Sequence, residues 1–141
     1  MRRIIASAVL LVLANSAGAQ AKPKMEPELK WGPAPEVFPS GAQMAVLKGD
    51  PTKPGNFTVR LKMPAGYIIP PHWHPTNENI SVVSGTFLVG MGKLMDTKTM
   101  KSLPAGGSIV ARAKEPHYAM TKGETVVQVR AKGPFAMTYV K

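Results

Sequence analysis

The chain has 141 residues and no cysteine, and 18 lysines and arginines against 8 aspartates and glutamates give it a formal charge of +10. This length allows one domain with its own core, and the lack of cysteine excludes disulfides, thiol catalysis and lipid attachment at a cysteine. Because the basic residues are scattered and form no run or stripe, the charge does not indicate a nucleic-acid partner.

Residues 1–19 have the pattern of a secretory signal. Two arginines precede an apolar run at residues 4–14, and Ala17-Gly-Ala19 follows as a small-residue cleavage site. The apolar run is too short to span a bilayer, so the sequence predicts a periplasmic or secreted protein without stable membrane insertion after cleavage. The general secretory route is favoured over the twin-arginine route because no polar residue precedes the arginine pair.

Residues 20–40 are rich in proline and show no sustained hydrophobic period. Proline fixes its own backbone and cannot donate a hydrogen bond, so this segment is expected to be an extended N-terminal arm. Trp31, Val37 and Phe38 give the arm apolar side chains. These side chains can lie on the body of the same chain or on a neighbouring subunit, and the second arrangement would make a homodimer.

Residues 41–141 are expected to form one all-β domain. Residues 57–63 alternate apolar and polar side chains, which is typical of a half-buried strand. The only helical signal follows Asp96, which can cap a single turn through Lys101. Short candidate strands are separated by glycine and proline turns, a pattern that indicates a β-sandwich or barrel. They cover residues 42–47, 57–63, 67–74, 80–83, 86–89, 108–113, 117–121, 125–130 and 135–140.

The three histidines of the chain all fall in candidate strands beside turns. His72 and His74 are two residues apart, so a strand would point both imidazoles to the same face. Glu78 follows four residues later, and His117 is the third histidine. A lone histidine on an apolar face is usually structural, but two imidazoles with a carboxylate nearby provide the nitrogen and oxygen donors that transition metals prefer.

The spacing of this segment resembles the first signature motif of the cupin superfamily. Gly66, five residues, His72-x-His74, three residues, Glu78, six residues and Gly85 agree with the motif at every defined position. Agreement at all five defined positions over twenty residues is specific.

The second cupin motif is matched only in part. Gly106 and His117 stand at the expected offset, but Arg112 replaces a proline, Lys114 a glycine and Thr121 an asparagine. The altered turn leaves the pose of His117 less well defined than that of the other three residues.

The resemblance implies a cupin-type jelly-roll barrel, also called a double-stranded β-helix, like those of small exported bacterial cupins. It also implies one divalent transition metal, which the donors allow to be Fe, Mn, Ni, Co, Cu or Zn. By the resemblance, the metal ligands are His72, His74, Glu78 and His117.

Two functions share these ligands. The first is a metalloenzyme of the dioxygenase, decarboxylase or lyase type, in which a small oxygen-rich substrate chelates the metal and Glu78 accepts a proton. The second is a non-catalytic module of the cell envelope that binds metal or a small ligand. An empty, purely structural cluster is disfavoured because it would bury four polar groups without partners.

The direction of several other polar side chains is left open. Arg112 and Lys114 can ring the mouth of the pocket with positive charge or belong to a solvated loop. Tyr118 and Gln128 lie on late strands and can face either the interior or the outside, since a one-residue bulge reverses the parity.

Overall fold

The structure is a computed structural model, and it describes residues 28–141. The predicted signal peptide at residues 1–19 and the first part of the predicted arm lie outside the described residues. No helix long and apolar enough to cross a membrane is found among the residues described.

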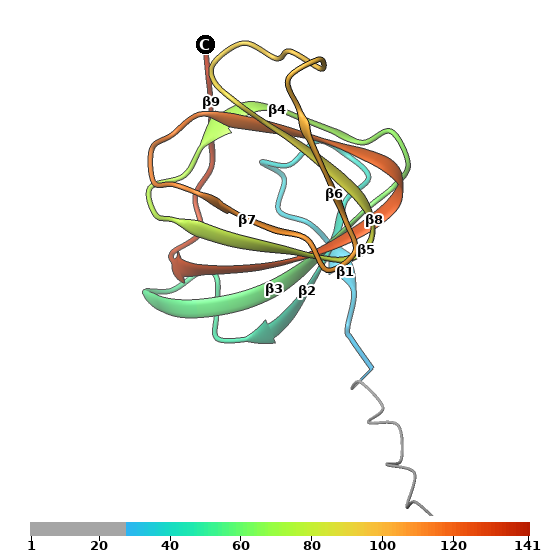
Figure 1. Cartoon of the computed structure of the whole chain (residues 1–141). Helices are drawn as coiled ribbons and strands as arrows, with labels where there is room; N and C mark the ends of the chain where they lie inside the picture. The colour runs from blue at the N-terminus through green and yellow to red at the C-terminus, as the bar shows by residue number, and fades with distance from the viewer. Residues whose placement is uncertain (1–27) are drawn as a thin grey trace, which may run out of the picture.

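Within residues 28–141 the chain forms a 9-stranded, antiparallel, strongly curled sheet (Figure 1). Neighbouring strands are hydrogen-bonded in the order β1-β2-β3-β8-β4-β9, and β5 pairs with β6, β7 and β8. The expected all-β barrel is confirmed. The strands are β1 Gly32–Pro33, β2 Gln43–Lys48, β3 Gly55–Met63, β4 Ile68–Trp73, β5 Glu78–Met91, β6 Lys101–Pro104, β7 Ser108–Ala111, β8 His117–Gly133 and β9 Thr138–Tyr139.

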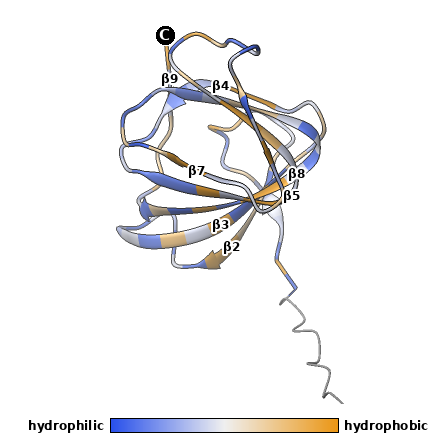
Figure 2. Ribbon diagram, in the orientation of Figure 1, coloured by the Kyte–Doolittle hydropathy of each residue, from blue (hydrophilic) through white to orange (hydrophobic). Residues whose placement is uncertain are grey.

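The alternation predicted for residues 57–63 is present in β3 and shows how the core is built. Phe57, Val59, Leu61 and Met63 are buried, while the residues between them are half-buried on the other face. The same two-residue period runs through β5 and β8, and Figure 2 shows hydrophilic and hydrophobic colours alternating along the strands. The barrel interior is therefore mainly apolar, and the few polar residues buried in it include the three histidines.

In the structure, β5 and β8 are each one continuous strand where the sequence predicts two. The sequence predicted breaks at Gly85 and at Gly123, but β5 runs for 14 residues and β8 for 17 residues through these positions. Both glycines take left-handed backbone angles, with φ of 77° and 74°. Each glycine therefore bends its strand without ending it, and the register between β5 and β8 shifts on both sides of Ser84.

The predicted helical turn after Asp96 is wrong. The Asp96 carboxylate accepts the backbone N–H of Lys98 at 3.0 Å, and the Thr99 N–H reaches the Asp96 carbonyl at 3.3 Å. The side chain and the carbonyl of Asp96 therefore close a tight turn, and the chain enters β6 at Lys101. An aspartate side chain that can bond the backbone two residues on stabilises a turn as readily as a helix start.

The described part of the arm lies on the barrel of the same chain. β1 pairs with β2, and the side chains of Val37 and Phe38 pack against the core. Two tyrosine hydroxyls hold its backbone: Tyr139 donates to the Val37 carbonyl at 2.7 Å, and Tyr67 donates to the Pro39 carbonyl. The division between arm and barrel at residue 40 and the homodimer both stay predictions.

Candidate metal centre

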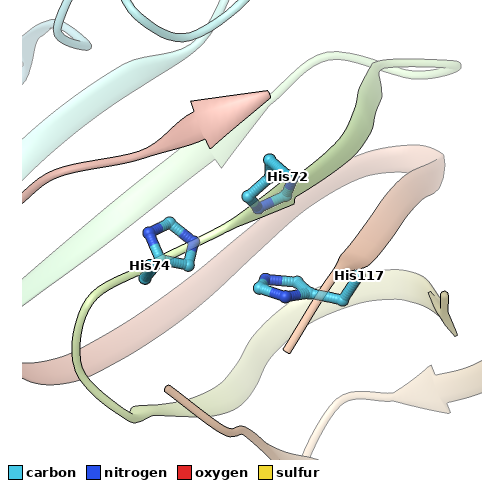
Figure 3. Close-up of side chains that lie close together, drawn as sticks. All are labelled: His72, His74 and His117. Carbon is cyan, nitrogen blue, oxygen red and sulfur yellow. The ribbon is translucent and has the colours of Figure 1, made fainter. Parts of the chain in front are cut away.

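Strand pairing brings the three histidines together from distant parts of the sequence. His72 lies on β4, His74 follows the end of β4, and His117 begins β8 directly opposite His72 in the antiparallel ladder. Figure 3 shows the three rings facing a common space between these two strands. His72 and His74 therefore share a face, as their spacing predicts.

The cluster is tight and buried. One ring nitrogen from each of the three histidines lies within 4.8 Å of the other two. The centroid of the His72 ring is 4.3 Å from that of His117 and 4.9 Å from that of His74. The exposed fractions of the three residues are only 3% to 4%. Such a distance between nitrogens allows one ion to touch all three.

Backbone carbonyls fix the tautomer of every histidine. The Nδ1 atoms of His72, His74 and His117 lie 2.7, 2.9 and 3.0 Å from the carbonyl oxygens of Pro70, Ala136 and Glu115. A carbonyl can only accept, so each Nδ1 carries the proton and each Nε2 keeps a lone pair. Metal-binding histidines in proteins usually make such a hydrogen bond with the ring nitrogen that does not face the metal, and it fixes the orientation of the ring.

The sequence carries a signal for this orientation that was missed. His72 and His117 both bond the carbonyl two residues earlier, and in both cases a proline, Pro71 or Pro116, stands between. Proline fixes its own φ and so limits the backbone conformations between the carbonyl and the histidine. The carbonyl of Ala136, which orients His74, comes from a remote segment, so no local pattern announces it.

Glu78 lies beside two of the three histidines. Its Oε2 atom is 3.1 Å from Nε2 of His74 and 3.9 Å from Nε2 of His117. Burial raises the pKa of Glu78 to about 8 and lowers the pKa of His72 to about 3 and that of His74 to about 4. The close contact between Glu78 and His74 is therefore a hydrogen bond between neutral groups near pH 7, and not an ion pair.

One argument from the sequence is wrong. A metal-free cluster was expected to leave its polar groups without partners, yet no buried side-chain nitrogen or oxygen among the described residues lacks a hydrogen bond. The carbonyls serve the imidazole N–H groups, and the Glu78 carboxyl serves His74. The cluster is thus a preformed set of oriented donor groups.

The space in front of the donors is small and has an apolar wall. The cavity that the four residues line has a volume of about 40 Å³. Since few polar groups surround it, charge on any of the four is poorly solvated, which explains the direction of their pKa shifts. The other lining residues are Phe38, Leu61, Ile69, Ile80, Phe87, Ala119, Val127 and Val129.

Four other candidates from the sequence do not line this cavity. Arg112 and Lys114 are exposed, as in a solvated loop. Tyr118 is buried on the opposite face of β8, where its hydroxyl donates to the Asp96 carbonyl at 3.1 Å. Gln128 is on the outside of the sheet and accepts the Arg60 Nε–H at 3.3 Å.

The structure explains how two residues that depart from the second motif fit their positions. Lys114 has φ of 61°, a left-handed conformation that suits the glycine expected at this position. Its N–H donates to the His74 carbonyl at 2.7 Å, so this turn is tied to the backbone just after β4. Thr121, in place of asparagine, donates to the Pro64 carbonyl at 2.6 Å and accepts the Tyr67 N–H at 2.9 Å.

Replacing Lys114 by glycine is expected to stabilise the protein. The left-handed conformation costs a side-chain-bearing residue about 1–2 kcal/mol, and the greater freedom of glycine in the unfolded chain cancels part of this. We expect Lys114→Gly to be about 0.5–1 kcal/mol more stable than Lys114→Ala in urea unfolding. Alanine is the matched control, because it removes the same amine and keeps the strain. Equal stability of the two variants would contradict this expectation, because the strain would then be no larger than the cost of ordering glycine.

Comparisons with known proteins agree with this geometry. The model of a family described as the ChrR cupin-like domain matches residues 25–135. No curated protein matches the chain.

Several solved structures share the fold. The polyketide cyclase RemF from Streptomyces resistomycificus has a TM-score of 0.67 at 18% identity, over 86% of this chain and 87% of the cyclase. A putative acetylacetone dioxygenase from Methylibium petroleiphilum has a TM-score of 0.63 at 22% identity, over 86% of each chain. KdgF from a Halomonas species has a TM-score of 0.56 at 23% identity, over 73% and 86%. At these identities the likeness shows the fold alone, and it is the cupin-type jelly roll.

Proposed function

The chain belongs to the ChrR cupin-like family, and from this premise we propose that it is a metalloenzyme acting on a small, oxygen-rich organic substrate. The site holds one divalent transition metal. Its proposed ligands are His72, His74, Glu78 and His117. The observation that carries the proposal is the convergence of three carbonyl-oriented imidazoles beside a buried carboxylate in an apolar cavity.

The donor set fits such an ion. Three neutral imidazole nitrogens and one carboxylate oxygen suit Fe(II), Mn(II), Ni(II), Co(II), Cu(II) or Zn(II). The imidazoles need no deprotonation, because the pKa values of His72 and His74 lie at about 3 and 4. When bound, the ion supplies a Lewis acid that can hold two oxygens of a substrate.

The protein's own residues have three tasks in this proposal. The carbonyls behind the imidazoles hold Nε2 toward the cavity. Glu78, when it leaves the ion, accepts a proton from the substrate at Oε2 and returns it to the product. The apolar wall, which includes Leu61 and Phe87, keeps bulk water away from the reacting atoms.

Two further features belong to the proposal. The fold neighbours include proteins described as a cyclase, dioxygenases and lyases, which supports an enzyme over a binding module. Export to the periplasm or the medium rests on the signal pattern at residues 1–19.

The test is turnover by the metal-loaded protein. We expect product formation, or oxygen uptake where the reaction is oxidative, with at least one member of a panel of β-diketones, flavonols and small carboxylates. Glu78→Gln is the matched variant, since it keeps the size of the side chain and removes the proton acceptor. We expect it to lower turnover by about 10²–10⁴-fold. Tight metal binding with no turnover across the panel would instead assign the non-catalytic module.

A further inference from the structure

The cavity at the metal centre is too small for an organic substrate. Its volume of about 40 Å³ has room for only a few water molecules, since about 10–15 Å³ of such space holds one. Pockets that bind organic ligands usually measure about 300–1,000 Å³. A substrate that reaches the metal with its oxygens must therefore place most of its atoms outside this cavity, beyond one of its walls.

Phe38 forms the wall that separates the cavity from a larger groove. Its side chain lines the cavity together with the four proposed ligands, and it also lines an outer groove of about 680 Å³. The groove lies against the strand that carries His72, since Pro70 and Pro71 precede it there and Tyr139 is its partner in β9.

The groove has the composition of a subsite for an apolar, aromatic body. Val37, Phe38, Pro70, Pro71 and Tyr139 provide its apolar surface. Leu94, on the loop after β5, also lines it with 85% of its surface exposed, the largest value among the exposed large apolar residues. An apolar side chain so poorly covered gains when a ligand covers it. The charged residues of the groove are Glu36, Lys93 and Lys141.

The backbone around Phe38 is held independently of its ring. The tyrosine hydroxyls bond the carbonyls of the two flanking residues, Val37 and Pro39, and not the ring itself. The ring packs against the core and stacks on Phe135, with a centroid distance of 5.6 Å and an interplanar angle of 7°. Phe135 in turn lies 5.6 Å from the His74 ring. Rotation of one side chain would thus join the groove to the cavity.

We propose that the outer groove is a second substrate subsite, and that Phe38 is the specificity-determining residue between it and the metal. The ligand class is a molecule with a two-oxygen chelating head and a planar apolar body, such as an aryl β-diketone. The body occupies the groove against Leu94 and Tyr139, and the head reaches the cavity past the displaced Phe38 ring. This assignment rests on the proposed function for the head of the ligand but not for its body.

The experiment compares a small and a large chelator of the same kind. Acetylacetone and dibenzoylmethane are titrated into protein loaded with Co(II), and binding is followed by the visible absorption of the metal. Phe38→Ala is expected to tighten dibenzoylmethane about ten-fold and to change acetylacetone less than two-fold. Leu94→Asp is expected to weaken dibenzoylmethane at least five-fold and to leave acetylacetone unchanged. The matched control is Val110→Asp, which alters an exposed apolar residue of β7 outside the groove.

The outcomes separate the subsite from the metal site. Equal effects of Phe38→Ala on both chelators, or equal effects of Leu94→Asp and Val110→Asp, would overturn the subsite. Binding of dibenzoylmethane to metal-free protein is measured in parallel by equilibrium dialysis. If the protein does not hold Co(II), the proposed function fails. The subsite then still stands or falls on whether Leu94→Asp weakens the metal-free binding.

Discussion

The His72→Ala protein is expected to lose its divalent metal, with an affinity roughly 100-fold below that of the wild type. Structural zinc sites with four ligands gain about 10–16 kcal/mol, so one ligand accounts for about 3 kcal/mol. His72 is 3% exposed, and its ring is close to those of both other histidines. The chain has no fourth histidine that could replace it. The measurement is competition with a chelator of known affinity, with Zn(II) as the added ion.

The control for this result is Val129→Ala. Val129 lines the same cavity and is 8% exposed, but it offers no donor atom. Its truncation should cost stability through loss of packing and leave the metal affinity within a few-fold of the wild type. If both variants lost metal equally, the loss would reflect general damage to the cavity, and ligation by His72 would be contradicted.

The stability of the metal-free protein should pass through a maximum near pH 6.5. The folded-state pKa of Glu78 is raised to about 8 from 4.5, so the folded form holds a proton that the unfolded chain has lost. Its contribution is fully present below about pH 4.5 and is lost as the pH rises through 8. The pKa values of His72 and His74 are lowered to about 3 and 4 from 6.5. Their contribution is present above pH 6.5 and is lost as the pH falls toward 4.

One proton difference above pH 6.5 corresponds to about 1.4 kcal/mol per pH unit. Relative to Glu78→Gln, the metal-free wild type should therefore lose about 2 kcal/mol of unfolding free energy between pH 6.5 and pH 8. Glu78→Gln cannot ionise, and the end of the histidine titration should make it slightly more stable over this interval in urea unfolding. Metal binding has the opposite trend and strengthens with pH, because the carboxyl must lose its proton to bind. A metal-free wild type with the same pH dependence as Glu78→Gln would show that Glu78 is already ionised in the fold.

The sequence was informative where a local pattern determines the contact. The face shared by His72 and His74 follows from the two-residue period of a strand, and the resemblance to the cupin motif added Glu78 and His117. The structure brings these four residues together. Each residue of this set is at the offset the motif requires, so the members of the cluster can be predicted from the sequence alone.

The sequence was uninformative where the contact is made over a distance. Nothing near Phe38 indicates that it closes the cavity, since the stacking partner Phe135 lies almost a hundred residues later. The strands predicted as separate at Gly85 and Gly123 are continuous because their antiparallel partners hold them through a bend. A glycine in a pattern looks the same whether it ends a strand or only bends it.

The partial second motif illustrates the limits of a spacing rule. Lys114 adopts the left-handed backbone that the motif provides for by glycine, and its N–H bonds the His74 carbonyl at 2.7 Å. The turn therefore keeps its conformation although lysine replaces the glycine that favours it. His117 keeps its place because the backbone contacts, and not the side chains of the motif, position it.

The most direct test of the central claim is anomalous diffraction from crystals of the protein grown with a single divalent transition metal. We predict one anomalous peak per chain, about 2.0–2.2 Å from Nε2 of His72, His74 and His117 and from a carboxylate oxygen of Glu78. A well-ordered map with no peak among these four residues, or with its only peak elsewhere, would contradict the metal centre.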